Sequence, residues 1–152
     1  MIDISNESHD VVDELALVQL ARFALEQLRI HPQADLSIIL VDPTVMADYH
    51  MRFMGLEGPT DVMSFPMDEL RSGQPGMPMP RGILGDIVIC PQFTSAQAPE
   101  NGRQPDEEIE YLLIHGLLHL LGHDHAEPEE KEVMFSLNDR IIAEWKRQKA
   151  KR

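Results

Sequence analysis

Apolar residues in the first third of the chain follow two different spacings. Residues 2–4 alternate between apolar and polar, and residues 36–41 form a short, mostly apolar run, so both segments are predicted to be strands. Between them the apolar positions recur with the helical period and predict an amphipathic helix over about residues 10–28. A second helix is expected over residues 42–53, because a capping aspartate is followed by a proline suited to the first helical turn.

The rest of the chain contains two further strand patterns and two further helix patterns. Residues 60–66 follow a glycine–proline turn signal and residues 83–90 are rich in β-branched side chains, so both are predicted strands. The intervening residues 71–82 contain three glycines and three prolines and are expected to form an exposed, mobile loop. Helices are predicted over residues 105–122, which begin with a proline and acidic residues, and over about residues 127–146.

These elements indicate an α+β fold, because the strands are not regularly interleaved with helices and no internal repeat is present. A length of 152 residues favours one domain over residues 1–152. No segment is apolar enough to span a bilayer, and the single cysteine, Cys90, cannot form an internal disulfide. The first residues lack the pattern of a secretory signal, so we expect a cytoplasmic protein with no membrane partner.

The charge balance is strongly acidic, with 13 Lys and Arg against 26 Asp and Glu and a formal net charge of -13. Such a chain does not attract nucleic acid over its whole surface, so any RNA binding must be local. Five of the basic residues lie in the last seven positions, which is typical of a solvated helix end or of a frayed tail over residues 147–152. A local basic groove would have to come from the arginines elsewhere in the chain, such as Arg52, Arg71, Arg81 and Arg103.

Four of the seven histidines fall within residues 115–125. His115 and His119 are four residues apart, so on a helix both imidazoles project from one face and can bind one metal ion. Gly122 can end that helix and let the chain turn back, which brings His125 towards the same ion. Three neutral imidazoles leave the fourth position of a tetrahedral Zn2+ open for water or substrate, the arrangement of catalytic zinc sites, so hydrolysis is the natural reaction class.

Other interpretations of this segment remain open. A ligand set of His115, His119 and His123 would lie along one helical face, although Gly122 disfavours a continuous helix there. Unrelated surface histidines are disfavoured, because the helix is apolar nearly all round and buried imidazoles without partners are costly. The histidine and glycine spacing matches the metzincin proteases, but Gly116 stands where their glutamate base stands. Other divalent transition metals also bind three imidazoles, so the ion is not fixed by the spacing.

Three motifs together resemble the YbeY family, bacterial metal-dependent endoribonucleases also called rRNA maturation factors. They span residues 59–66 (PTDVMSFP), 84–89 (LGDIVI) and 115–125 (HGLLHLLGHDH), and they extend over about the middle half of the chain. The resemblance implies a small mixed β-sheet with helices packed against it and a metal site on a central buried helix. It implies one zinc ion per chain, held by three histidines that map to His115, His119 and His125.

The resemblance further implies cleavage of single-stranded RNA, maturation of 16S rRNA and quality control of the small ribosomal subunit. The small ribosomal subunit and its assembly factors would be the partners, and no DNA substrate is expected. The family usually carries an arginine where this chain has Met54, and Arg52 is the nearest candidate. Arg52 is the candidate catalytic residue: its guanidinium would clamp the scissile phosphate and stabilise charge on the phosphorane, or it would be an ordinary exposed helix arginine.

The other polar residues of the motifs have structural interpretations as well. Thr60, Asp61 and Ser64 are expected to satisfy backbone groups around the turn and strand. Asp86 would orient a ligand histidine or make a local contact. The leading hypothesis is a zinc-dependent endoribonuclease. The alternatives are a metalloprotease-like hydrolase and a ribosome-assembly binding module with a structural metal.

Overall fold

The computed structural model describes residues 1–68, 73, 75–76 and 81–151. Its centre is a four-stranded sheet with the strand order β1-β2-β4-β3. Strands β1, β2 and β4 are parallel, whereas β3 pairs antiparallel with β4 at one edge. The expected small mixed sheet is therefore confirmed. The strands are β1 (Ile2–Asn6), β2 (Asp35–Leu40), β3 (Val62–Pro66) and β4 (Ile83–Ile89).

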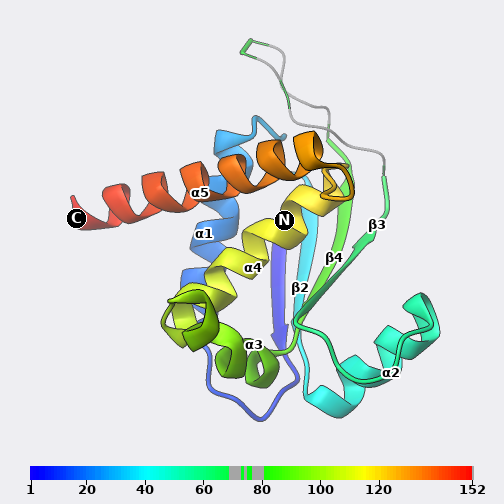
Figure 1. The fold of residues 1–152 in the computed structure, drawn as a ribbon. Helices are drawn as coiled ribbons and strands as arrows, with labels where there is room; N and C mark the ends of the chain where they lie inside the picture. The colour runs from blue at the N-terminus through cyan, green and yellow to red at the C-terminus, as the bar shows by residue number, and fades with distance from the viewer. Residues whose placement is uncertain (69–72, 74, 77–80, 152) are drawn as a thin grey trace.

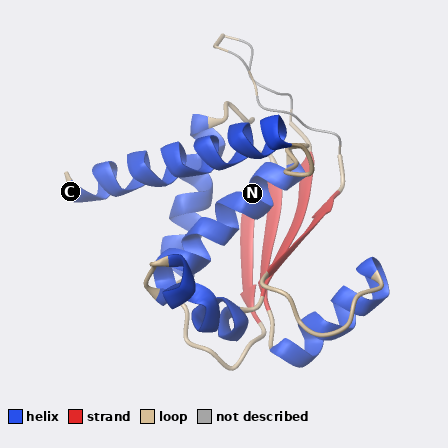
Figure 2. Ribbon diagram, viewed as in Figure 1, coloured by secondary structure: helices blue, strands red, loops and turns tan. Residues whose placement is uncertain are grey.

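Helices cover both faces of this sheet. On one face pack α1 (Glu14–Gln27), α4 (Pro105–Leu120) and α5 (Pro128–Ala150), and on the other packs α2 (Pro43–Met54). Figures 1 and 2 show α2 near the β3 edge, apart from α1, α4 and α5. A short helix, α3 (Pro91–Gln97), and a 3-10 turn, η1 (Ala98–Asn101), lead from β4 into α4. The prediction of an α+β fold is correct.

The alternation of side chains along the strands divides the core into two parts. Ile38 of β2 lies beside Ile87 of β4, and both belong to the large cluster under α1, α4 and α5. Val88 points to the opposite face and belongs to a smaller cluster with Met46 of α2. Because successive residues of a strand face opposite sides, this pattern fixes the register of the sheet. Helix α4 lies between the sheet and α5, and its buried residues pack against both.

The element boundaries differ from the predictions in ways that local chemistry explains. Helix α1 begins at Glu14 rather than near residue 10, because the carboxylate of Asp13 accepts a hydrogen bond from the Ala16 amide and caps the helix. The sequence patterns predicted no element for residues 91–101, where the structure has α3 and η1. This segment is too short for a helical period to be visible, yet the burial of Thr94 and Ala98 holds it in place.

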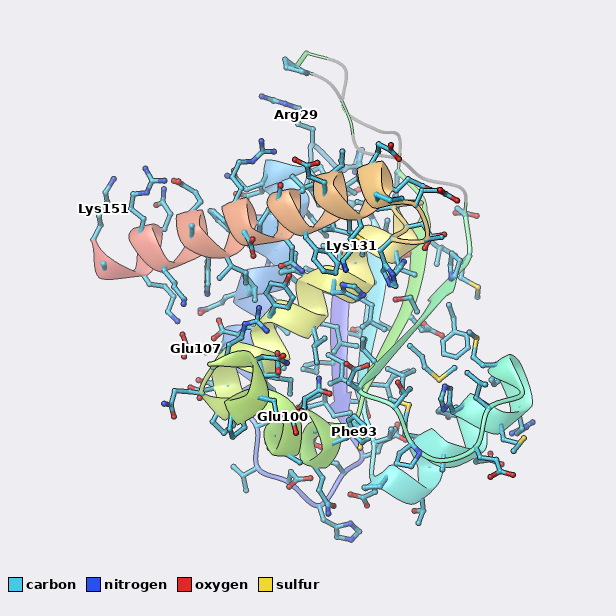
Figure 3. All side chains as sticks on the ribbon, viewed as in Figure 1. Arg29, Phe93, Glu100, Glu107, Lys131 and Lys151 are labelled. Carbon is cyan, nitrogen blue, oxygen red and sulfur yellow. The ribbon has the colours of Figure 1, made fainter. Side chains whose placement is uncertain are left out.

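The last helix is longer than expected and runs through residues 147–150 of the basic tail. A helix of 23 residues is about 34 Å long, so its basic end lies far from its first turn. Figure 3 shows this separation between Lys131 and Lys151. None of the helices in the described part of the chain is long and apolar enough to cross a membrane. The loop expected over residues 71–82 lies largely outside the described residues.

Candidate metal centre

Two histidines of the candidate centre project from the last two turns of α4. The helix begins with a capping box, in which Gln104 and Glu107 bind each other's backbone amides. Nine of its residues are buried, so the imidazoles of His115 and His119 are held between the sheet and α5. The helix ends at Leu120, and Gly122 adopts a φ of 92°, which reverses the chain.

This reversal brings His125 from the loop before α5 to the two helical histidines. One ring nitrogen from each of His115, His119 and His125 lies within 4.8 Å of the other two. The Nε2 atoms of His115 and His119 are 3.1 Å apart. Zinc binds imidazole nitrogen at about 2.0–2.1 Å, so nitrogens this close can share one ion. The residues present therefore fit a single transition-metal ion.

A hydrogen bond to the backbone selects the tautomer of His119. Its Nδ1 donates to the carbonyl oxygen of His123 over 3.0 Å, which leaves the Nε2 lone pair directed at the cluster. The amide of His123 in turn donates to the Leu118 carbonyl at the helix end. The imidazole of His123 is not part of the cluster formed by the described residues. His123 thus supports the centre through its main chain.

Burial keeps these imidazoles neutral, as metal ligands must be. Desolvation lowers the pKa of His115 from 6.5 to about 4; the neighbouring His119 and His125 lower it further, and Asp61 opposes them. Burial also lowers the pKa of His119, although its bond to the His123 carbonyl opposes that shift. At neutral pH the two helical histidines carry free lone pairs.

Phe135 of α5 forms a wall of the centre that sequence reasoning missed. Its ring lies 6.0 Å from the ring of His115 and 6.1 Å from that of His125. The ammonium of Lys131 lies 5.5 Å from the centre of the same ring, on the first turn of α5 (Figure 3). No sequence signal distinguishes Phe135, since it belongs to the ordinary apolar stripe of its helix.

The residue after His115 is packed directly against the sheet. A Cβ atom at Gly116 would lie 2.9 Å from a methyl carbon of Ile87, 3.1 Å from Oγ of Ser64 and 3.3 Å from Val62. A glutamate at this position therefore requires these side chains of β3 and β4 to shift. The metzincin base is missing from the sequence, and the packing here disfavours it.

A cavity of about 570 Å³ opens beside His119, between α2 and β3. Its size lies within the usual range of small-molecule sites. Apolar and aromatic side chains dominate its wall, which consists of His50, Phe53, Met54, Thr60, Val62, Met63, Ser64, Phe65, Pro66 and His119. Met54, the position of the expected family arginine, is therefore at the cavity.

Arg52 is described by the structure but is not among the residues that line this cavity. Its side chain is exposed on α2, and its Nη1 pairs with the Asp48 carboxylate over 3.3 Å. Arg103 pairs with the buried Glu108 instead of facing the cluster. Arg81 lines a separate cavity near the N-terminus, and Arg71 is outside the described part of the chain. Arg52, Arg81 and Arg103 thus do not line the cavity beside His119, and the expected groove does not form from them there.

The remaining motif residues have structural contacts. The carboxylate of Asp61 accepts hydrogen bonds from the Val62 amide over 2.7 Å and from Gln97 over 3.0 Å. Thr60 donates to the same carboxylate. Asp86 of β4 precedes Ile87, so it points away from the face on which Ile87 meets α4. The expectation that Asp86 orients a ligand histidine is not supported by this placement.

Comparison with known proteins agrees with this geometry. A family model described as Endoribonuclease YbeY matches residues 3–146. Proteins named Endoribonuclease YbeY from Cutibacterium acnes and Thermobifida fusca are 66% and 55% identical to this chain. These alignments cover 95% and 96% of this chain, respectively, and 94% of each relative.

A solved structure shares the fold at lower identity. The solution structure of TM1509 from Thermotoga maritima superimposes with a TM-score of 0.58 at 23% identity, over 100% of this chain and 96% of the other. At that identity the likeness concerns the fold alone. The family model and the close relatives, which extend over nearly the whole chain, establish the relationship: this chain belongs to the Endoribonuclease YbeY family.

Proposed function

We propose that this protein is a zinc-dependent endoribonuclease that cleaves single-stranded RNA. The observation that carries the proposal is the three-histidine cluster beside an open cavity. Relatives that are 66% and 55% identical are named as endoribonucleases, which supports RNA as the substrate. Zinc is the proposed ion because three neutral imidazoles are a common catalytic zinc set, one ion per chain.

The residues of this chain would hold the ion and the substrate in fixed positions. His115, His119 and His125 are the proposed ligands, and the His123 carbonyl keeps His119 in its binding tautomer. When bound, zinc supplies a lowered pKa for a coordinated water and polarises a phosphoryl oxygen. Phe135 shields one side of the cluster from water, which strengthens electrostatic interactions at the centre.

Arg52 is the proposed contact to the RNA backbone. Its guanidinium is exposed on the same helical turn as Phe53 and Met54, which line the cavity. A phosphate would replace the exposed Asp48 carboxylate as its partner, and such exposed pairs are weak. The Arg52 guanidinium lies 5.8 Å from the centre of the Phe53 ring, which lines the cavity.

Two other functions have less support. A metalloprotease of the metzincin type requires a glutamate at the position of Gly116, where even a Cβ atom would crowd Ile87 and Ser64. A binding module with a structural metal would be expected to close the metal with a fourth protein ligand. The described histidine cluster contains three such ligands and borders a cavity.

The cellular role that we propose is maturation of 16S rRNA and quality control of the small ribosomal subunit in the cytoplasm. The sequence motifs that resemble the YbeY family support this role, and the small subunit with its assembly factors would be the partner. A precursor of small-subunit rRNA is the natural substrate to test once cleavage of model RNA has been measured.

The direct experiment compares cleavage of a labelled single-stranded RNA with cleavage of its duplex. Metal-loaded protein, chelated protein, His119→Ala and a control, His31→Ala, are assayed side by side. We expect metal-loaded protein and His31→Ala to cut the single strand, and the other two proteins to be inactive. Undiminished cleavage by His119→Ala would refute the assigned site. A lack of cleavage in every sample, with binding to the small subunit that survives chelation, would favour the binding module.

A further inference from the structure

Large apolar side chains are exposed at the C-terminal end of α2 and in the residues that follow it. Four of them have between 47% and 61% of their surface exposed: Met51, Phe53, Met54 and Leu56. Exposed apolar side chains that gather in one place mark binding surfaces more often than scattered ones do. Figure 1 shows that α2 stands at the β3 edge of the sheet, away from the other helices. We call this surface the α2 patch.

The α2 patch continues into the cavity that reaches His119. Phe53 and Met54 belong to both, and the cavity also contains Phe65 of β3. The rings of Phe53 and Phe65 meet edge to face with their centres 5.1 Å apart. The centre of the Tyr49 ring lies 6.1 Å from that of Phe53 and 6.4 Å from that of Phe65. Phe53 is therefore an exposed aromatic ring that its neighbours hold in position.

The wall of this cavity differs in charge from the rest of the molecule. The chain carries a formal net charge of -13, yet none of the described residues that line the cavity is acidic. Each of four other cavities has at least one carboxylate in its wall. Among these cavities, the one beside His119 therefore has the wall that repels a polyanion least. Charge and aromatic character together favour a nucleic acid strand over a basic protein segment.

The loop that closes the cavity is tied to α2. The Nδ1 of His50 donates a hydrogen bond of 2.9 Å to the Gly58 carbonyl, which leaves its Nε2 as an acceptor. Thr60 follows in the same loop and also lines the wall. This hydrogen bond holds the loop to α2, which reduces the rearrangement needed when a ligand enters the cavity.

We infer that this cavity holds one unpaired base of the RNA, stacked on Phe53, next to the nucleotide whose phosphate reaches the histidine cluster. The inference rests on the proposed function and extends it, because it assigns the residue that selects single strands. Bases stack on aromatic rings without regard to sequence, and only an unpaired base can leave its helix to do so. Phe53 is a positioning residue, since it contacts the base rather than the reacting phosphate.

The test measures KM and kcat for a short single-stranded RNA with wild-type protein, Phe53→Ala, Phe53→Trp and Leu15→Ala. Leu15 is the matched control, an exposed apolar residue on α1. Loss of one stacked base weakens binding by roughly tenfold, so KM for Phe53→Ala should rise by about that factor. Phe53→Trp should keep the wild-type KM, because it retains an aromatic face. Leu15→Ala should leave both constants unchanged.

A second set of substrates locates the stacked base. One abasic ribose is placed in turn at each position near the mapped cut. We expect a single position to raise the wild-type KM by the same factor as Phe53→Ala does. At that position the abasic substrate should add nothing to the effect of Phe53→Ala, because both changes remove one contact.

Three results would overturn the inference. If the wild-type protein cleaves RNA and Phe53→Ala has the same KM, Phe53 does not bind a base. The proposed nuclease function would still hold. Sedimentation in which Phe53→Ala only dissociates a wild-type dimer, with KM unaffected, would assign the α2 patch to self-association. If the wild-type protein cuts no RNA, the proposed function fails and 2-aminopurine fluorescence decides the inference. A single-stranded RNA that contains 2-aminopurine is mixed with wild-type protein and with Phe53→Ala. Fluorescence quenching by the wild type alone would support the stacked base, and equal fluorescence with both proteins would overturn the inference.

Discussion

The hydroxyl of Ser64 in β3 donates a hydrogen bond of 2.9 Å to the backbone carbonyl of Gly116 in α4. The two residues are 52 positions apart in the chain, and Gly116 directly follows the proposed ligand His115. The contact is possible because glycine lets the helix approach the strand closely. The edge strand and the metal-binding helix are therefore locked together at the candidate centre.

Replacement of Gly116 by alanine tests this close packing, because the packing determines whether the unfolding free energy rises or falls. Inside a helix, Gly→Ala ordinarily stabilises by up to about 1 kcal/mol. Here the new Cβ would meet Ile87 at 2.9 Å and Ser64 at 3.1 Å. We expect a net destabilisation of about 1–3 kcal/mol, from overpacking, in urea unfolding experiments. The double variant with Ser64→Ala should recover part of the loss, and a stabilised Gly116→Ala protein would contradict the close packing.

The roles of the two histidines after α4 can be separated by metal content. His125→Ala removes a proposed ligand, so we expect the purified protein to lose most of its metal, as judged by elemental analysis. His123→Ala keeps the backbone carbonyl that binds His119, and we expect close to one equivalent of metal in that variant. The reverse pattern would support the ligand set of His115, His119 and His123.

Arg52 should contribute to RNA affinity through a single charge close to Phe53 of the cavity wall. We expect Arg52→Ala to raise KM several-fold and to weaken the dependence of KM on salt, with little change in kcat. Arg147→Ala is the control, because Arg147 is an exposed arginine paired with a glutamate on its own helix. A large fall in kcat for Arg52→Ala would instead indicate that the guanidinium contacts the scissile phosphate.

Arg103 should act on stability rather than on RNA. Glu108 is fully buried and accepts hydrogen bonds from Arg103 over 2.8 Å and from Asn101 over 2.6 Å. Arg103→Met leaves a buried carboxylate without its cation, and we expect a loss of about 3 kcal/mol in urea unfolding. The double variant with Glu108→Leu should regain most of that loss. A KM for RNA that changes independently of stability would contradict this assignment.

The metal-free protein should become less stable as the pH falls. Burial lowers the pKa of His115 from 6.5 to about 4, so between these values the unfolded chain binds a proton that the folded chain does not. Stability increases with pH wherever the unfolded state binds more protons, and it is therefore lost as the pH falls from 6.5 towards about 4. Urea unfolding of chelated protein across this window measures the effect. His115→Asn should reduce the dependence of the unfolding free energy on pH. The same dependence in that variant would show that other groups cause it.

Most of the fold could be predicted from local patterns. The strand segments, the helical stripe of α1 and the buried helix α4 appear in the sequence as periodic apolar positions. Helix α1 begins later than its apolar spacing predicted, because the side chain of Asp13 caps the helix at that point. Helix α3 was missed because only its tertiary contacts bury it.

The candidate centre was predictable only in part. The spacing of His115 and His119 places them on one helical face whatever the rest of the protein does. The helix-ending Gly122 favoured His125 over His123 as the third member, and the cluster of described residues contains His125. Phe135 carried no signal, because its part in the centre arises from packing between α5 and α4.

The sequence by itself determined the elements, the histidine pair and the motifs that place this chain among its relatives, because each depends on residues close together in the chain. The tertiary structure alone decided the cavity beside His119, the pairing of Arg52 with Asp48 outside that cavity's wall and the contact between Ser64 and Gly116. The physical reason is that periodicity and capping report interactions over a few residues, whereas a cavity wall is formed by segments brought together through burial of the common core.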